Sequence, residues 1–450
     1  MSVHYFCCFS FGLQQSIQNL YSSDELNLNK SNECAIDSIL YFCNMQSLLI
    51  IGYVWPEPTA TAAGTRMLQI IEQFLVSGYK ITFASPAHRP TTAFDLSEIG
   101  VVEQEIKLND SSFDCFIDAL DPYVVLFDRF MMEEQFGWRV AEICPSALRI
   151  LDSEDLHFLR KARHQAIKKG DVLPTEIIHS DEAMREIASI YRCDVTFTIS
   201  EFEMKYLKEI FGIPEDLLWY LPFLVEISDR PTLDFEERQD FLFIGNFIHK
   251  PNWDAVLQLK HHVWPLLRKK LPEAKLHVYG AYSSEKVFQL HHTKENFLVH
   301  GRAEEVSEVM EKARVCLAPI RFGAGLKGKL IDAMKSHTPF VTSPIGAEGM
   351  FGEIDLEVSI ADHLEDFVSK SEALYLDKDL WVETTKRGEE VLRSRFDKNI
   401  IQKDFGDKLK MAKEQLEARR FKNFVGGMLQ HHTMKSTKYL SKWITEKNKS

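Results

Sequence analysis

The sequence predicts an α/β protein made of two doubly wound halves in tandem, and three features of the chain indicate this fold. Short apolar runs rich in branched residues alternate with segments of helical periodicity, as expected for buried parallel strands joined by helices. The alternation begins near residue 45, pauses in a proline-containing stretch at 213–237, and then starts again. The length of 450 residues also exceeds that of one ordinary domain. Two such halves leave a deep cleft between them, where ligands commonly bind.

The first half opens with an apolar run at 47–54, which predicts a buried strand. A loop at 55–64 follows, and apolar residues then repeat at helical spacing from Met67 to Phe74. Further strands of this half are expected at 80–85, 124–127, 148–151 and 195–199.

The second half repeats the alternation. Its strands are expected at 241–245, 275–279, 297–300, 315–319 and 340–342, and its helices from about Trp253, over 306–313 and from near Gly325. We therefore divide the chain into a non-core extension (1–44), a first Rossmann-like domain (45–230), a second one (231–404) and a basic helical tail (405–450).

Composition narrows the environment and the partners. A net charge of −13 argues against general nucleic-acid binding. The segment 405–450 nevertheless holds 11 Lys and Arg against 4 Asp and Glu, so it is either a solvated helix face or a contact for anionic lipid head groups. The later cysteines stand singly with no C-x-x-C spacing, and no apolar run is long enough for a membrane helix. A cytoplasmic protein, with peripheral contact to the inner membrane face as an option, fits these features best.

One loop carries a phosphate-binding pattern. Residues 323–329, Gly-Ala-Gly-Leu-Lys-Gly-Lys, fit the G-x-x-x-x-G-K part of a P-loop, but Leu330 stands where a hydroxyl should hold Mg²⁺. Glycines let backbone N–H groups approach an anion, and a helix beginning near Gly325 would add its positive end. The cations expected to meet a diphosphate are Arg321, Lys327 and Lys329, beside the amides of Gly323 and Gly325.

Asp332 completes this pattern. Gly325, Lys329 and Asp332 are separated by four and then three residues, which would place the three on one helix face. A carboxylate one turn below the cations could accept hydrogen bonds from ribose hydroxyls, so the pattern suits a nucleoside diphosphate. The alternative is an ordinary solvated helix start.

Several ordered motifs closely resemble the GT-B glycosyltransferases of the retaining family-4 (group 1) type. In the second half these are 241–256, 323–334 and 342–350, and in the first half 60–66, 151–157 and 193–203. The resemblance spans about residues 46–405. It implies transfer of a sugar from a nucleotide diphosphate sugar with retained anomeric configuration, the donor on the second half and the acceptor on the first. Asp332 stands where the family has a ribose-binding glutamate.

Two positions depart from the family pattern. Ala324 replaces a glutamate that engages the donor sugar, and Asn246 replaces an arginine after the first donor strand. A Gly-Ala-Gly-x-Lys subgroup tolerates the first change, so the resemblance leaves the sugar open.

The resemblance and the strand ends together nominate the remaining site residues. Asp155 and His157 follow the strand at 148–151 and are the expected catalytic residues, with Asp152 and Glu154 as rivals. The other donor-site residues expected are Gly64, Thr65, Gly245, Lys250, Asn252 and Glu348. For Lys250 and Asn252 helix capping is the alternative role, and for Glu348 bracing of its loop.

With cations and amides available for the leaving diphosphate, we expect a metal-independent enzyme without a cofactor. The acceptor is expected to be a glycan or a lipid-linked molecule, as in surface glycan or glycolipid synthesis. Two rivals share the architecture: a nucleotide-sugar epimerase and a non-catalytic nucleotide-sugar-binding protein. An oxidoreductase is disfavoured, because the loop 55–64 lacks the G-x-G-x-x-G spacing.

Overall fold

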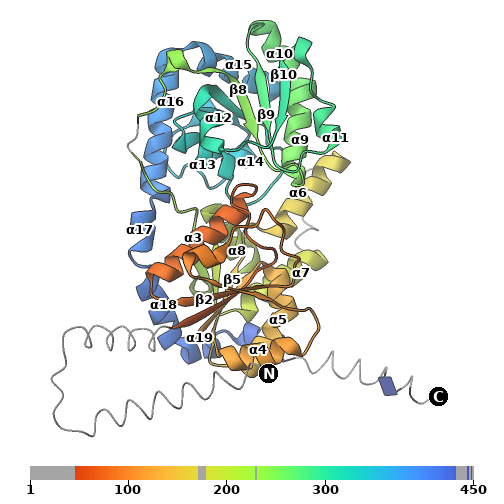
Figure 1. The fold of residues 1–450 in the computed structure, drawn as a ribbon, viewed down its shortest axis with the longest axis vertical. Helices are drawn as coiled ribbons and strands as arrows, with labels where there is room; N and C mark the ends of the chain where they lie inside the picture. The colour runs from red at the N-terminus through yellow and green to blue at the C-terminus, as the bar shows by residue number, and fades with distance from the viewer. Residues whose placement is uncertain (1–45, 171–178, 229–230, 432–442, 445–446, 448–450) are drawn as a thin grey trace, which may run out of the picture. The chain divides into compact units, whose positions relative to one another are not determined.

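The computed structural model describes residues 46–170, 179–228, 231–431, 443–444 and 447, and all structural statements below concern these residues (Figure 1). The expected extension at 1–44 and most of the tail beyond 431 lie outside them.

The first half is built on a seven-stranded parallel sheet in the order β3-β2-β1-β4-β5-β6-β7. Its strands are β1 (Ser47–Ile51), β2 (Lys80–Ser85), β3 (Val102–Glu105), β4 (Val124–Asp128), β5 (Leu148–Asp152), β6 (Val195–Thr198) and β7 (Leu218–Tyr220). The strand order reverses between β1 and β4. In open α/β sheets ligands bind at the carboxyl ends of strands beside such a switch point.

Helices cover both faces of this sheet. They are α3 (Ala62–Val76), α4 (Ser112–Leu120), α5 (Phe130–Ile143), α6 (His157–Lys169), α7 (Asp181–Arg192) and α8 (Glu201–Phe211). On one face, Leu49 and Phe127 pack with apolar residues of α4 to α8. On the other, Ile50 and Leu126 pack with α3, so β1 and β4 are buried on both sides.

The second half is built on a five-stranded parallel sheet in the order β10-β9-β8-β11-β12. Its strands are β8 (Gln239–Ile244), β9 (Leu276–Tyr279), β10 (Phe297–Gly301), β11 (Ala313–Ala318) and β12 (Phe340–Thr342). Its helices are α9 (Lys250–Gln258), α10 (Trp264–Lys270), α11 (Glu285–Phe288), α12 (Val306–Lys312), α13 (Gly328–Lys335), α14 (Pro344–Ala347), α15 (Leu364–Leu376) and α16 (Lys378–Val391). The order again reverses, here between β8 and β11.

The C-terminal helices return to the first half: Figure 1 shows α16 beside the second half, then α17 (Lys398–Gln402), and then α18 (Phe405–Glu414) beside the first half. Phe405 packs edge-on against Phe74 of α3, with ring centroids 5.1 Å apart, and also contacts Trp219. The last described helices are α19 (Leu416–Lys422) and α20 (Phe424–Gln430). The start of the tail is therefore part of the core of the first half. No helix in the described part of the chain has the length and apolarity that a bilayer span requires.

The parallel α/β fold predicted from the sequence is confirmed, and the strands β2 and β12 have the expected bounds. Two strands were not expected. Both β3, of sequence Val-Glu-Gln-Glu, and the three-residue β7 lie at sheet edges, where short or charged strands are favoured because an edge must not recruit other chains.

One expected helix start was wrong. Helix α13 begins at Gly328 and not near Gly325, because Gly325 has a φ of 63° and Lys327 is extended. Gly325 therefore does not share a helix face with Lys329 and Asp332; it lies in the loop that leads into the helix.

Candidate active site

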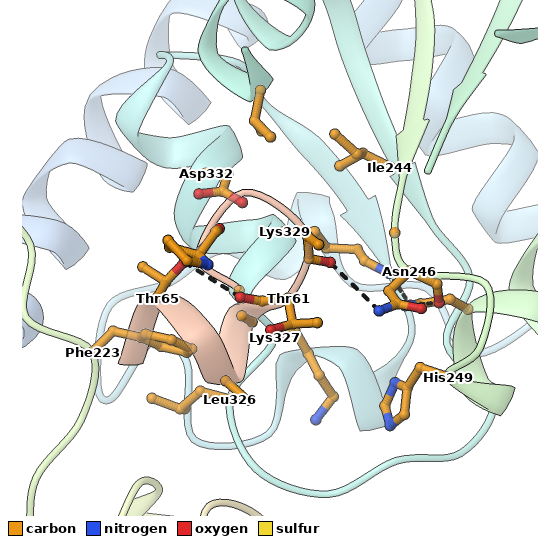
Figure 2. A pocket seen from close by; sticks show the side chains of 18 of the residues that line it. Thr61, Thr65, Phe223, Ile244, Asn246, His249, Leu326, Lys327, Lys329 and Asp332 are labelled. Atoms are coloured by element: carbon orange, nitrogen blue, oxygen red, sulfur yellow. Dashed lines mark hydrogen bonds between the residues drawn. The ribbon is translucent and has the colours of Figure 1, made fainter. Parts of the chain in front are cut away.

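A cavity of about 1160 Å³ lies where the carboxyl ends of the two sheets face each other. Figure 2 shows side chains from both halves around it, among them Thr65, Asn246, Lys329 and Asp332. The residues predicted for the site that line the cavity are Thr65, Asp155, His157, Gly245, Asn252, Gly323, Gly325, Lys327, Lys329 and Asp332.

The loop before α13 forms one wall, and its backbone is already partly engaged. The Gly325 amide donates to Glu203 Oε1 at 2.8 Å, so this amide does not face an incoming anion. The Lys327 ammonium donates to the Gly325 carbonyl at 2.6 Å. The amides of Gly328 and Lys329 open the first turn of α13, where N–H groups have no partner within the helix. The helix start that could meet an anion thus lies about three residues later than the sequence pattern predicted.

Lys329 projects toward the end of β8. Its ammonium donates to Asn252 Oδ1, and the Asn252 amide donates to the Asn246 carbonyl at 2.9 Å. A Cβ at Gly245 would meet the Asn252 side chain at 2.7 Å, so a larger residue there would displace Asn252. Burial lowers the pKa of Lys329, and also that of Lys327, to about 8. Two desolvated ammonium groups on one turn are suited to a polyanion.

Asp332 lies one turn along α13, and Figure 2 shows it on the cavity side of that helix. Burial raises its pKa to about 6, against the opposing effect of Lys335 and Lys329. Leu330, Ala333 and Met334 face the core of the second half. The cavity side of the helix therefore presents Lys329 and Asp332 together.

The opposite wall comes from the start of α6. Burial alone would raise the pKa of Asp155, but the Arg160 guanidinium, which donates to this carboxylate, holds it well below its usual range. His157 Nε2 lies 3.5 Å from Asp155 Oδ1, and burial lowers the pKa of the imidazole to about 4. His157 is therefore neutral near pH 7, and Asp155 is an ionised carboxylate held by Arg160.

A cluster of three carboxyl groups lies behind this wall. One oxygen each from Asp128, Asp152 and Glu154 lies within 4.8 Å of the other two. Arg66 donates to Asp152 at 2.8 Å and Arg129 to Asp128 at 3.1 Å. Burial raises the pKa of Glu154 well above its ordinary value and also raises that of Asp128. Two guanidinium groups balance the negative charge of two of the three carboxyl groups, and a proton on Glu154 would neutralise the third. Of the two rivals to Asp155 and His157, Glu154 lines the cavity, whereas Asp152 is fully buried.

Four residues predicted for the site lie outside the cavity lining. Arg321 makes a two-pronged ion pair with Asp254, with Nε 2.9 Å from Oδ2, and is exposed. Glu348 binds Arg163 through both oxygens at 2.7 Å, which agrees with the loop-bracing alternative. Lys250 is an exposed first residue of α9. Gly64 packs on the loop before α3, where a Cβ would meet the Glu57 backbone at 2.5 Å.

Other residues at the site were not selected from the sequence. Arg160, Arg163 and His249 are near the cavity or its loops, and Glu203 bridges the two halves. Arg163 and Glu203 have partners that are far away in sequence; Arg163 and Glu348, for example, are 185 positions apart. One feature of the sequence could have pointed to such a residue: a charged side chain in a helix that also carries apolar core residues, as at Glu203 of α8.

Comparisons with known proteins agree with this architecture. Residues 238–377 match the family model described as glycosyl transferases group 1. No curated protein matched the chain by sequence.

Solved structures share the fold over most of the chain. A glycosyltransferase from Rickettsia africae ESF-5 superposes with a TM-score of 0.59 at 11% identity, covering 83% of this chain and 99% of that one. The sucrose-phosphate synthase of Thermosynechococcus elongatus gives 0.59 at 13% identity, covering 81% and 98%. Anabaena Alr3699/HepE in complex with UDP and glucose gives 0.56 at 10% identity, covering 81% and 99%. The fold is thus GT-B, and the family match supports a glycosyltransferase.

Proposed function

We propose that the protein transfers a sugar from a nucleotide diphosphate sugar to an acceptor hydroxyl, with retention of the anomeric configuration. One observation carries the proposal. Lys327, Lys329 and Asp332 face the same cavity as Asp155 and His157, so cations for a diphosphate and polar groups for an acceptor meet across one space. The family match over residues 238–377 supports the same activity for the half that holds the cations.

In the proposed reaction, the bond between the anomeric carbon and the diphosphate oxygen breaks, and the acceptor oxygen forms the new bond to that carbon. The acceptor proton passes to the leaving diphosphate. Negative charge grows on the diphosphate in the transition state, so fixed cations and amides aimed at it lower the barrier most. Lys327, Lys329 and the first amides of α13 supply this stabilisation. Asp332 would accept hydrogen bonds from the ribose, and His157 with Asp155 would orient the sugar or the acceptor hydroxyl.

A thermal-shift series tests donor binding directly. UDP-sugars come first, since the Anabaena neighbour was solved with UDP, followed by GDP- and ADP-sugars. A ligand that binds only the folded state raises Tm, by an amount set by its concentration relative to Kd. Transfer to glycan and lipid-linked acceptors is then measured with the donor that shifts Tm. Isomerisation of the donor without an acceptor would instead identify an epimerase, and binding without turnover a non-catalytic protein.

We expect a bell-shaped pH profile for kcat/KM of the donor. Asp332 must be ionised to accept bonds from the ribose, and its pKa of about 6 sets the acidic limb. The lysines must be charged to hold the diphosphate, and their pKa of about 8 sets the alkaline limb. The rate constant should therefore rise as pH passes 6 and fall as it passes 8. Asp332→Asn should lower the plateau and remove the acidic limb; a wild-type profile that is flat across this range would contradict the assignment.

We propose that catalysis needs no metal, because Lys327 and Lys329 would supply the positive charge that a divalent cation otherwise brings to the diphosphate. Activity should be unchanged after dialysis against EDTA and unchanged by added Mn²⁺. Among the described residues, Asp128, Asp152 and Glu154 are the one group of three or more potential metal ligands. The EDTA experiment therefore also tests whether this carboxyl cluster holds a metal that catalysis needs. Loss of activity in EDTA that Mn²⁺ restores would overturn the proposal.

We further propose peripheral membrane contact through the C-terminal helices, in keeping with a lipid-linked acceptor on the cytoplasmic side and a role in surface glycan or glycolipid synthesis. Phe421 and Phe424 are 91% and 79% exposed on α19 and α20, and Met428 is exposed beside them. Apolar side chains of this kind, next to a basic segment, favour an anionic interface. Flotation with vesicles containing phosphatidylserine should carry the full chain with them, and Phe421→Ser with Phe424→Ser should reduce the bound fraction. Equal flotation of both forms would contradict this contact.

A further inference from the structure

Glu203 links the two walls of the cavity through a single oxygen atom. Its carboxylate is fully buried at the first turns of α8. Oε1 accepts a hydrogen bond from the Leu156 amide, just before α6, at 2.9 Å. It accepts a second one from the Gly325 amide at 2.8 Å; Gly325 belongs to the loop 323–327 before α13, which we call the lysine loop. The two donors are 169 positions apart in the chain and belong to different halves. One carboxylate oxygen therefore fixes the distance between the loop that precedes Lys327 and the helix that begins with His157.

The surroundings of this oxygen leave little freedom for either backbone. Gly325 has a φ of 63°, and a Cβ there would lie 2.9 Å from Asp155 Cβ and 3.3 Å from Ile199 Cγ2. The loop thus packs directly on the residues before α6. Arg163 of α6 adds a second contact, since it donates to the Gly323 carbonyl at 2.8 Å while it holds Glu348. The lysine loop of the second half is shaped by side chains of the first.

The other carboxylate oxygen gives a further clue. Oε2 of Glu203 is buried and has no hydrogen-bond partner among the described residues. An unpaired buried oxygen is costly, so a residue kept for stability alone would be better paired or apolar. The two hydrogen bonds that backbone amides donate to Oε1 are the contacts that account for an acceptor oxygen at this position.

We propose that Glu203 is a positioning residue that holds the diphosphate-binding loop and the His157 helix in register, so that the donor and the acceptor-side groups meet at a fixed spacing. This inference rests on the proposed transferase function. It does not require Glu203 to touch the substrate. It predicts that activity depends on an oxygen at the position of Oε1 that accepts the two hydrogen bonds, and that activity does not depend on the negative charge of Glu203.

Three variants of Glu203 separate these contributions. Glu203→Gln keeps an oxygen that can accept both amides and should retain kcat/KM within about threefold of wild type, because the geometry is preserved. Glu203→Ala leaves both amides without their acceptor and should raise the donor KM and lower kcat, with a combined loss of about 100-fold, as expected for a small misplacement of reacting groups. Glu203→Asp keeps the charge on a shorter side chain and should resemble Glu203→Ala. Glu209→Ala, on the exposed side of the same helix, is the matched control and should behave as wild type.

Hydrogen exchange gives a readout independent of activity. In the wild type the Leu156 and Gly325 amides should be protected, and in Glu203→Ala the exchange of both should accelerate together, whereas Glu203→Gln should retain protection. Normal kcat/KM in Glu203→Ala would overturn the proposal, as would an equal loss in Glu203→Gln. If Glu203→Ala does not fold, Glu203→Asp decides, since full activity there would also contradict it. Failure of the wild type to bind any nucleotide sugar would refute the proposed function instead, while the exchange data would still test the link between the two walls.

Discussion

Replacement of both Lys327 and Lys329 by alanine should abolish the thermal shift with nucleotide sugars and lower kcat/KM by about 10³-fold or more, the scale seen when preorganised groups that stabilise transition-state charge are removed. Both ammonium groups line the cavity on one turn of the chain. Burial lowers the pKa of each to about 8, so the protein already bears a cost for holding them there without an anion. A bound diphosphate would repay that cost, because a charge-assisted hydrogen bond is stronger in a desolvated site.

The same substitutions should leave the fold intact, which far-UV circular dichroism checks. Lys327 and Lys329 are not part of the apolar core of the second half, which is built by residues such as Leu330 and Met334. Lys269→Ala with Lys294→Ala, two exposed lysines of the same half, removes equal charge at a distance and should leave donor binding unchanged. A thermal shift that persists in the Lys327 and Lys329 double variant would place the diphosphate elsewhere in the cavity, near Arg302 or Arg129.

The sequence predicted the fold well where strands are buried on both faces. β1 and β4 each carry four consecutive apolar residues, because their side chains face a layer of helices on both sides of the sheet, and such runs are recognisable without knowledge of tertiary contacts. The edge strands β3 and β7 carry charged or few residues and so lack this signal. The start of α13 was misplaced for a related reason. The left-handed backbone of Gly325 is imposed by packing on Asp155, a contact that helix periodicity does not contain.

The sequence predicted which residue types form the site better than it predicted how their side chains are arranged and paired. Gly323, Lys327, Lys329 and Asp332 lie at one cavity because they are close in sequence. Arg321 is just as close, yet Asp254, one turn into α9, holds it in an ion pair. A local pattern shows which charges are present but not which of them already have a partner. Arg163 binds residues of the other half of the chain, and Glu203 accepts one amide from each half, so only the folded structure reveals these contacts.

Replacement of Arg66 by alanine should lower the free energy of unfolding by about 3–5 kcal/mol, the loss found when one partner of a buried ion pair is removed. Arg66 is fully buried on α3. Its guanidinium donates to Asp152 at 2.8 Å and to the Leu221 and Pro222 carbonyls at 2.6 and 3.2 Å. Without it, Asp152 would remain beside Glu154 and Asp128 with its charge uncompensated, and two carbonyls would lose a donor.

Urea denaturation of the two proteins measures this loss, and Arg89→Ala is the matched control. Arg89 pairs with Glu103 at 2.8 Å as Arg66 pairs with Asp152, but its side chain is 31% exposed, so its loss should cost at most about 1 kcal/mol. The deficit of Arg66→Ala should shrink as the pH is lowered, because burial raises the pKa of Glu154 and of Asp128, and their protonation removes negative charge beside Asp152. A deficit that is below about 1 kcal/mol, or that does not change with pH, would mean that Arg66 serves only as packing. A large, pH-dependent loss would show that Asp128, Asp152 and Glu154 need this arginine to remain buried. The cavity wall in front of these carboxyl groups would then depend on α3, a helix that packs on the other face of the sheet.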